Sequence, residues 1–402
     1  MCTLLCHTGS KLVLRIINDF SLSALVAGFV AVLIGFASSV AIVFQAAQAA
    51  GADANTIVSW IMALGFGMGA TCFFLSLWYR SPVITAWSTP GAALLATSLG
   101  SISYAEAIGV FVFAGILTLL TGISGLFDRV MRLVPLPLAC AMLAGVLFKF
   151  GLSIFDSMMS DAFLVGLMLI SYLVSKQLVP RYAVLFVLIA GVAFVLARSN
   201  GQLMADVPFS LGSFVLVWPE WNIGALIGIG IPLYIVTMTS QNIPGVAVMR
   251  SSGYQTPVSP LISWTGFTSI VLAPLGGFAF NLAAITAAIC SGDECHKDPK
   301  RRYIAGLSAG VFYSLAGLAG TSVVALFSIF PVTMIATLAG IALLGTIGMN
   351  LKNAMMDDSN REAALVTFLV TVSGVSFGGI ASAFWGILFG VICLLISKIK
   401  FK

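Results

Sequence analysis

The chain has 402 residues, of which 60% are hydrophobic and only 8% are charged. Soluble domains are about half apolar and about a quarter charged, so this composition excludes a water-soluble fold. A formal net charge of +5 would suggest an anionic partner for a soluble protein, but in a membrane protein basic residues first orient the helices. The composition therefore predicts a protein of the lipid bilayer, with no nucleic-acid partner.

Apolar runs of roughly 20 residues, enough to span a hydrocarbon core, recur along the chain. They lack period-two alternation, so they predict helices and not barrel strands. Charged or Gly/Pro-rich breaks divide them into fourteen segments, at 21–49, 55–78, 82–98, 104–125, 133–155, 159–178, 181–198, 222–241, 257–273, 277–291, 301–323, 326–349, 362–377 and 379–397. We therefore predict an all-α integral membrane fold with fourteen transmembrane segments.

Segments 3 and 10 differ from the others because they are short and interrupted. Turn-forming and small residues stand where a continuous helix would have its middle, at 81–91 and at 274–281. Proline and glycine are the residues that helix interiors tolerate least. Each of these two segments is therefore expected to contain a break within the membrane.

The basic residues give the predicted orientation. All lysines and arginines except Arg198 and Lys149 fall on one side of the fourteen-segment arrangement. Because basic loops remain in the cytoplasm, both termini are predicted to be cytoplasmic, with residues 1–20 as a cytoplasmic N-terminal segment. No short apolar run with a cleavage site opens the chain, so no signal peptide is expected.

The two halves of the sequence resemble each other at a separation of about 195 residues. LAGV at 143–146 matches LAGI at 338–341, and the interrupted segments also superpose. Seven spans per half is an odd number, so the second half would be inverted relative to the first. Inverted repeats with a binding site at discontinuous helices are typical of secondary transporters. Chance similarity among apolar segments is the alternative.

Both interrupted segments contain residues that favour the start of a helix. Ser88 can cap a helix whose first turn contains Thr89 and Pro90, where the missing N–H of proline is harmless. Asn281 is expected to cap the second half-helix. A helix start carries unpaired amides and about half a positive charge, which suits a carboxylate. The alternative is a proline-kinked helix with water in the kink.

Three amide side chains are placed at membrane depth. Gln241 and Asn242 are predicted to close segment 8, and Gln45 lies near the far end of segment 1. Buried amides need hydrogen-bond partners, so these side chains are expected to face the protein interior. They would contact either the substrate and the half-helices or a neighbouring helix.

Lys149 is the only ionisable residue well inside a predicted span. Such a residue is a functional candidate, and it could attract an organic anion. Alternatively its side chain could extend towards the outer surface, near Asp156. No Asp or Glu is placed in mid-membrane, so no residue for ion coupling is predicted.

The remaining motifs indicate neither metal binding nor catalysis. Cys290, Cys295 and His296 lie among charged residues and lack a second ligand pair, which favours a solvated turn over a metal site. The cysteines form no paired framework, and no nucleotide-binding loop or hydrolase motif occurs. We therefore expect no disulfide, metal, cofactor or enzymatic activity.

Four stretches carry a resemblance to a known family: LWYRSPVITAWSTPGAA at 77–93, SQNIPG at 240–245, PVSPL at 257–261 and AAITAAIC at 283–290. They resemble the BenE family of bacterial benzoate transporters, from about residue 20 to the C-terminus. The resemblance implies a fold similar to the uracil transporter, in a bacterial inner membrane. It also implies a core domain at 21–125 and 222–323 and a gate domain at 133–198 and 326–397.

The resemblance further implies proton-coupled uptake of benzoate or a related aromatic carboxylate. Our hypothesis for the movement is a rocking or elevator-like carrier. We expect a homodimer through the gate domain. The predicted substrate-binding residues are Gln45, Thr85, Trp87, Ser88, Thr89, Gln241, Asn242, Phe280 and Asn281, with Trp87 and Phe280 as the aromatic wall. Nucleobase members of the wider fold carry glutamates on spans 8 and 10, where this chain has Gln241 and Asn281. The alternatives are an anion channel, or a carrier of another small organic anion, on the same fold.

Overall fold

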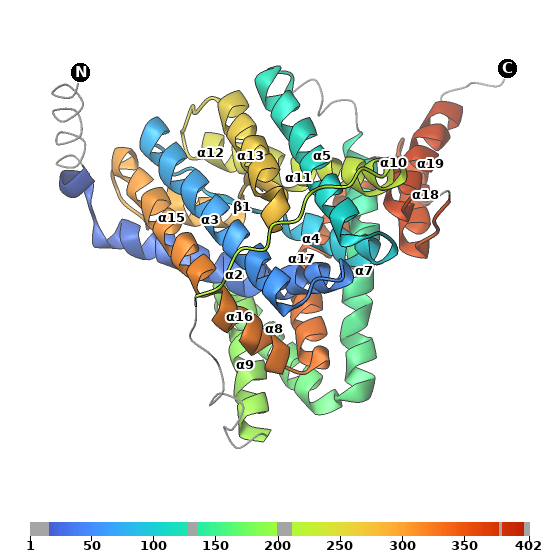
Figure 1. Cartoon of the computed structure of the whole chain (residues 1–402), viewed down its shortest axis with the longest axis horizontal. Coiled ribbons are helices and arrows are strands. Elements are labelled where there is room, and N and C mark those ends of the chain that lie inside the picture. Colours follow the sequence, from blue (N-terminus) through green and yellow to red (C-terminus); the bar gives the residue numbers. More distant parts are fainter. Residues whose placement is uncertain (1–15, 128–134, 199–210, 378–379, 398–402) are drawn as a thin grey trace.

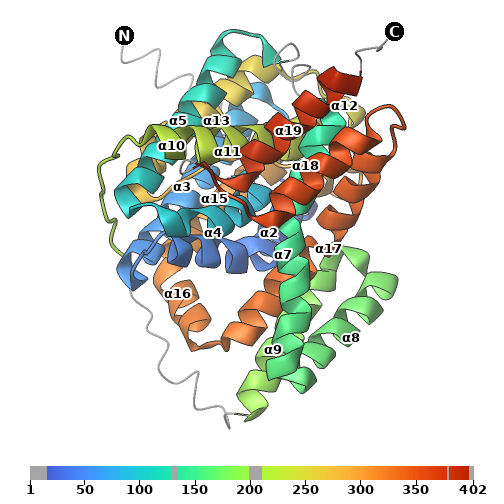
Figure 2. The same ribbon diagram turned by 90° about the vertical axis from the view of Figure 1, so that its right-hand side faces the viewer.

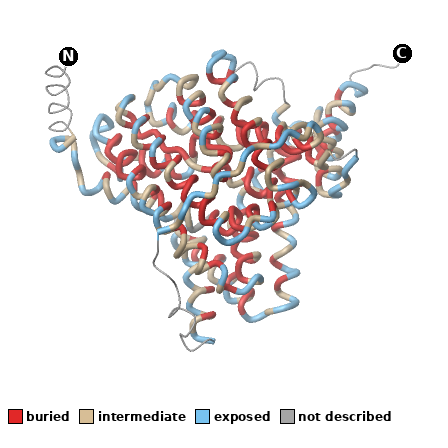
Figure 3. The backbone as a smooth tube through the Cα atoms, viewed as in Figure 1, coloured by how far each residue is buried: buried red, intermediate tan, exposed pale blue. Residues whose placement is uncertain are grey.

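The computed structural model describes residues 16–127, 135–198, 211–377 and 380–397. Among these residues the regular structure is helical except for two three-residue strands. Buried residues are concentrated in the middle of the molecule (Figure 3). Most of the predicted N-terminal segment 1–20 lies outside the described ranges.

The first half of the chain forms helices that follow the apolar runs closely. Ser21, Asp53 and Ser103 each cap the helix that follows them, because the side-chain oxygen accepts a hydrogen bond from an otherwise unpaired N–H. The helices are α2 (Leu22–Ala49), α3 (Ala54–Tyr79), α4 (Thr89–Ser98), α5 (Tyr104–Ile123), α7 (Leu136–Ser160), α8 (Ala162–Leu178) and α9 (Ala183–Arg198).

The second half begins with one continuous helical segment, 223–251, which contains the helices α10, α11 and α12. The helices of this half are α10 (Ile223–Ala225), α11 (Ile231–Thr237), α12 (Ile243–Ser251), α13 (Val258–Leu272), α14 (Ile285–Ser291), α15 (Tyr303–Leu318), α16 (Gly320–Ile329), α17 (Val332–Met355), α18 (Arg361–Ser373) and α19 (Ser382–Ser397). Figures 1 and 2 show their arrangement from two directions.

Several of these helices have the length and composition of membrane spans. Within the described ranges, six helices qualify singly, and up to eight spans result if each of two bent pairs counts as one. Three shorter apolar helices, α8, α9 and α19, accompany them. The chain is therefore a mainly helical multi-pass membrane protein.

The helix boundaries on either side of α16 differ from the sequence prediction. The predicted segment 301–323 ends early, since α15 stops at Leu318 and α16 leaves it at an angle of 60°. The segment predicted to begin at 326 begins at Val332 instead, directly after Pro331. Proline favours a first helical turn or the position before it, because it cannot donate an internal hydrogen bond.

Close helix packing relies on small residues. A Cβ added at Gly65 of α3 would lie 2.6 Å from the Cα of Gly317 in α15, and one at Gly69 would lie 2.8 Å from the carbonyl oxygen of Gly310. Side chains larger than hydrogen would force α3 and α15 apart. Small residues at such contacts are the usual means by which membrane helices associate.

The helices form two sets by their main contacts. In the first set, α15 contacts α3 and α2, and α2 contacts α4. The second set is built around α7. Helix α7 contacts α17 and α18, and α18 contacts α19 (Figure 2). Gly340 permits the approach of α17 to α7, because a Cβ there would lie 2.3 Å from the carbonyl oxygen of Phe150. The site described below lies where this second set meets helices of the first.

Candidate functional site

Two short strands cross where the interrupted segments meet. Strand β1 (Thr85–Trp87) pairs antiparallel with β2 (Phe280–Leu282), so that Ala86 stands opposite Asn281. The pairing continues on both sides, since the Ser88 N–H donates to the Ala279 carbonyl (3.1 Å) and the Ala283 N–H donates to the Ile84 carbonyl (2.9 Å). Non-helical backbone at membrane depth must find such partners, and these two segments supply each other.

Side chains of neighbouring helices hold the crossing in place. The Thr85 hydroxyl lies 2.5 Å from that of Thr71 in α3. On the other strand, the Leu282 N–H donates to Asn242 Oδ1 (2.9 Å) and the Phe280 N–H donates to Ser269 Oγ (3.1 Å). Thr85 and Asn242 are fully buried, and in this structure they anchor the strands.

Helix α4 begins directly after β1, with the cap expected from the sequence. Ser88 Oγ accepts from the Gly91 N–H (3.0 Å), and the Ser88 carbonyl accepts from the Ala92 N–H (2.7 Å). Pro90 has no N–H to offer. The N–H and hydroxyl of Thr89 are therefore the first-turn donors left for a ligand. The sequence predicts several unpaired amides at this helix start, whereas the structure leaves only the N–H of Thr89.

The second interrupted segment differs from the prediction. Asn281 was expected to cap a half-helix, but it lies in β2, and α14 begins only at Ile285, after Ala284, which offers no side-chain cap. The Asn281 Nδ2 donates to the Ala279 carbonyl (2.9 Å). The N-cap prediction was wrong because pairing with β1 keeps residues 280–282 extended, and α14 has only seven residues.

A cavity of about 280 Å³ adjoins the start of α4. Its walls come from both sets of helices, and none of its lining residues carries a formal charge at neutral pH. The lining residues are Ile34, Gly35, Ser39, Met68, Ala86, Trp87, Thr89, Pro90, Pro180, Val184, Leu185, Gln241, Ala283, Ala284, Ile285, Thr286, Tyr313, Ala342, Leu343 and Thr346. We call this space the α4 cavity.

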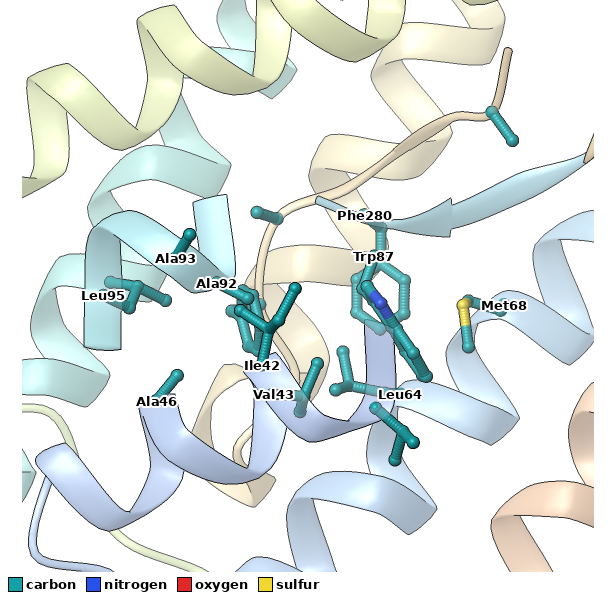
Figure 4. Close-up of a cluster of buried hydrophobic side chains, with 14 of the residues drawn as sticks. Ile42, Val43, Ala46, Leu64, Met68, Trp87, Ala92, Ala93, Leu95 and Phe280 are labelled. Carbon is teal, nitrogen blue, oxygen red and sulfur yellow. The ribbon is translucent and has the colours of Figure 1, made fainter. Parts of the chain in front are cut away.

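The structure brings three of the predicted binding residues to the α4 cavity: Trp87, Thr89 and Gln241. The predicted residues Thr85, Ser88, Asn242, Phe280 and Asn281 are fully buried behind it. Phe280 points towards α3, where a Cβ at Gly67 would lie 2.4 Å from its ring. Gln45 does not line the cavity. In Figure 4 this part of α2, with Ile42, Val43 and Ala46, faces Ala92, Ala93 and Leu95 of α4.

Trp87 has a fixed orientation in the wall. Its Nε1 donates to Ser39 Oγ (2.8 Å), and the Ser39 hydroxyl donates to the Gly35 carbonyl (2.7 Å). Its ring meets that of Phe36 edge-on, with centroids 5.0 Å apart. The cavity also includes Tyr313 and Thr346, which the sequence prediction missed. Each is one of several uncharged polar residues in its helix, and no local signal distinguishes it from the others.

Gln241 lies within a helix and does not end one, which corrects the prediction for segment 8. The helix continues to Ser251 and contains two π-helical turns, at 226–230 and 238–242. A proline follows each turn, Pro232 and Pro244. Proline cannot donate the usual bond to the residue four before it, and the wider turn accommodates that loss. The second turn carries both Gln241 and Asn242.

The loop with Cys295 and His296 is held by one buried cation. Arg302 donates from Nε to the His296 carbonyl (2.7 Å) and from a terminal nitrogen to the Ser291 carbonyl (2.6 Å). Burial raises the pKa of the Cys295 thiol to about 11. The Cys295 side chain is fully buried within this loop.

A multi-pass helical fold with paired interrupted segments beside a central cavity defines a membrane transport protein. A family model described as benzoate membrane transport protein, BenE, matches residues 18–396. The chain belongs to this family, whose members are transporters and not enzymes.

Two relatives match almost end to end. One is the inner membrane protein YdcO of Escherichia coli, 47% identical over 375 residues, which are 93% of this chain and 96% of the relative. The other is the benzoate membrane transport protein of Acinetobacter baylyi, 43% identical over 381 residues, which are 94% and 96% of the two chains. The chain is accordingly a multi-pass inner membrane protein of the bacterial type.

Solved structures share the fold at low sequence identity. The transmembrane domain of the cyanobacterial bicarbonate transporter BicA has a TM-score of 0.57 at 17% identity, covering 94% of this chain and 97% of that one. SLC26A9 has a TM-score of 0.61 at 15% identity, covering 97% of this chain and 68% of that one. At these identities the likeness concerns the fold alone.

Proposed function

We propose that this chain is a secondary active transporter that carries benzoate or a related aromatic carboxylate across the bacterial inner membrane. The observation that supports this most strongly is the α4 cavity, which combines a capped helix start with apolar walls. The name of the Acinetobacter relative supports the choice of substrate. Binding would occur without a lysine or arginine in contact with the anion.

The carboxylate would be held at the start of α4. Thr89 offers an N–H and a hydroxyl there, and Gln241 offers an amide from the π-turn on the facing segment. A hydrogen bond to a charged group contributes about 1.5–3 kcal/mol, and the helix dipole adds about 0.3–1 kcal/mol. Two or three such contacts would give a weak but specific anion site.

The aromatic ring would occupy the apolar part of the α4 cavity. Trp87, Met68 and Leu343 form walls there, and Trp87 is held rigidly by Ser39. An aromatic pair in a suitable geometry contributes about 0.5–1.5 kcal/mol beyond the area that it buries. The cavity is near the lower end of the roughly 300–1,000 Å³ range of small-molecule pockets, which suits a single ring.

We propose further that the spans number fourteen, as two inverted repeats of seven with both termini cytoplasmic. The division into core and gate domains is supported by the separate packing of α3 with α15 and of α7 with α17 and α18. The α4 cavity has walls from both groups, so movement of one group past the other would open and close it. Proton coupling and a homodimer through the gate domain belong to the same proposal.

Uptake of labelled benzoate into proteoliposomes, with and without an inward proton gradient, tests this function. We expect saturable uptake that the gradient accelerates. Absence of saturable uptake for any aromatic carboxylate would refute the substrate class. Uptake that ignores the gradient would refute proton coupling alone.

The second candidate function is a channel, or a carrier, for another small anion. One observation favours it. A helix start and neutral amides can bind many anions, because they contact only the charged group and not the rest of the anion. Electrical recording separates the two functions. Anion currents far above carrier turnover would support a channel, and uptake of a small aliphatic carboxylate in preference to benzoate would support the other carrier.

A further inference from the structure

A second and larger cavity, of about 510 Å³, lies at the opposite end of α4. The α4 cavity meets Thr89 and Pro90 at the start of this helix, whereas the second cavity meets its last turns. The remaining walls come from α7, from the beginning of the segment 223–251 and from the connection between α18 and α19. We call this space the Lys149 cavity, after the one ionisable residue in its lining.

Lys149 is exposed, although it lies in the middle of the apolar helix α7. A Cβ added at Gly374 would lie 2.9 Å from its Nζ, so the ammonium group sits against the backbone that follows α18. Among the ion pairs of the described residues, none involves Lys149. A charge within a membrane span that faces a cavity and has no counter-charge marks a site for an anion.

Two long helices begin at the same cavity. Gly224 belongs to the first turn of the segment 223–251, and Ser382 and Ala383 begin the 16-residue helix α19. The two starts are neighbours, because a Cβ at Gly228 would lie 2.7 Å from the Ala381 nitrogen. Helix starts carry partial positive charge, so both reinforce the charge of Lys149.

One carboxylate, that of Glu106, lies behind the cavity lining and is hydrogen-bonded to neutral groups. Glu106 accepts from the Asn222 Nδ2 and from the Ser103 N–H, each at 2.7 Å. At the end of α4 the Thr97 hydroxyl donates to the Leu94 carbonyl (2.9 Å). The hydrogen bonds to Glu106 hold its carboxylate against Asn222 and Ser103, whereas Lys149 is the ionisable residue that lines the cavity itself.

The two cavities occupy related positions in the two halves of the sequence. Ile34 lines the α4 cavity and Ile229 lines the Lys149 cavity, which is the separation of about 195 residues found between the repeats. The same separation relates Lys149 to Leu344 of α17, the residue that follows Leu343 in the lining of the α4 cavity. The cation is therefore a feature of one cavity and not of the other.

We propose that the Lys149 cavity is a second anion site, which binds a small carboxylate through Lys149 and the two helix starts before the anion reaches the α4 cavity. This inference rests on the proposed transport function for the order of events, but the binding itself does not require transport. Lys149 attracts the anion and binds it at the cavity that carries its name, before the anion moves on.

Uptake kinetics test whether Lys149 attracts the anion. We expect Lys149→Met to raise the KM for benzoate about tenfold at low ionic strength and to weaken its dependence on salt, because attraction of the anion is lost. Lys149→Arg should stay within about twofold of the wild type. The matched control is Lys176→Met, which removes an equal charge from α8, where Lys176 contacts Tyr172 outside both cavities. Equal KM values for Lys149→Met and Lys176→Met would overturn the proposal.

Lysine labelling tests the binding without transport. Benzoate should slow the reaction of Lys149 with an amine-reactive reagent in the purified protein, measured by mass spectrometry, and leave Lys176 unaffected. The protection should persist in Thr89→Val, whose α4 cavity is weakened. No protection of Lys149 would refute the second site. Protection without any uptake by the wild type would support the site and refute the transport function instead.

Discussion

The adjacent residues Gln241 and Asn242 are expected to have opposite roles, and Asn242→Leu tests this. Asn242 is fully buried, and its Oδ1 accepts the Leu282 N–H at 2.9 Å. Leucine has a similar size but no acceptor, so the substitution leaves the backbone N–H of β2 buried and unpaired. An unpaired buried donor costs about 1–3 kcal/mol. We expect a loss of about 2 kcal/mol, which changes the ratio of folded to unfolded protein by roughly thirtyfold.

The assay is denaturant-induced unfolding of the purified protein in mild detergent, combined with a benzoate titration. Gln241→Leu is the matched control, because Gln241 is half-buried and lines the α4 cavity. This control should keep the stability of the wild type and weaken benzoate binding about tenfold, the effect of one hydrogen bond to a charge. A stable Asn242→Leu variant together with a destabilised Gln241→Leu variant would refute the assignment of anchor and ligand.

Three further predictions follow from local geometry. Gly276→Ala should give no monodisperse protein in size-exclusion chromatography, since Gly276 has φ +91° and its Cβ would lie 1.9 Å from Trp60 Cδ1; a well-folded variant would contradict the close approach. Ser88→Ala should lower the stability of the protein by about 1 kcal/mol, because the cap on Gly91 is lost; an unchanged unfolding midpoint would contradict the capping role. Hydrogen bonds from the Thr56 hydroxyl and N–H lower the pKa of Asp53 in the folded protein. The carboxylate therefore stabilises the fold above the pKa that it has in the unfolded chain, and this stabilisation is lost as the pH falls through the lower folded pKa. The unfolding midpoint of Asp53→Ala should therefore approach that of the wild type below about pH 4 and fall short of it at neutral pH.

The helices could be predicted because the apolar runs are local signals. Lipid exposure and the lack of charged residues define where a helix lies, and caps such as Ser88 define where one begins. The break before α16 was missed because Ala319 and Gly320 lie in a long uncharged run, in which the neighbouring Thr321 and Ser322 do not by themselves indicate a helix end. Such a break depends on the packing of neighbouring helices.

The candidate site was predictable only in part, for a physical reason. Thr89 and Trp87 follow from the break and cap of segment 3, and both line the α4 cavity. Asn281 was misjudged because its strand pairs with residues almost 200 positions earlier, which no local pattern reveals. Gln241 resembled a helix end because polar residues usually terminate spans, whereas the π-turn before Pro244 lets the helix continue.

The most direct test of the proposed binding site is a structure of the protein with 4-bromobenzoate, in which the anomalous signal of bromine locates the ring. We expect a bromine peak within the α4 cavity, between Trp87 and Leu343, with the carboxylate directed at Thr89. A weaker second peak in the Lys149 cavity would agree with the two-site scheme. Bromine found only outside the α4 cavity would contradict the assignment of this cavity as the substrate site.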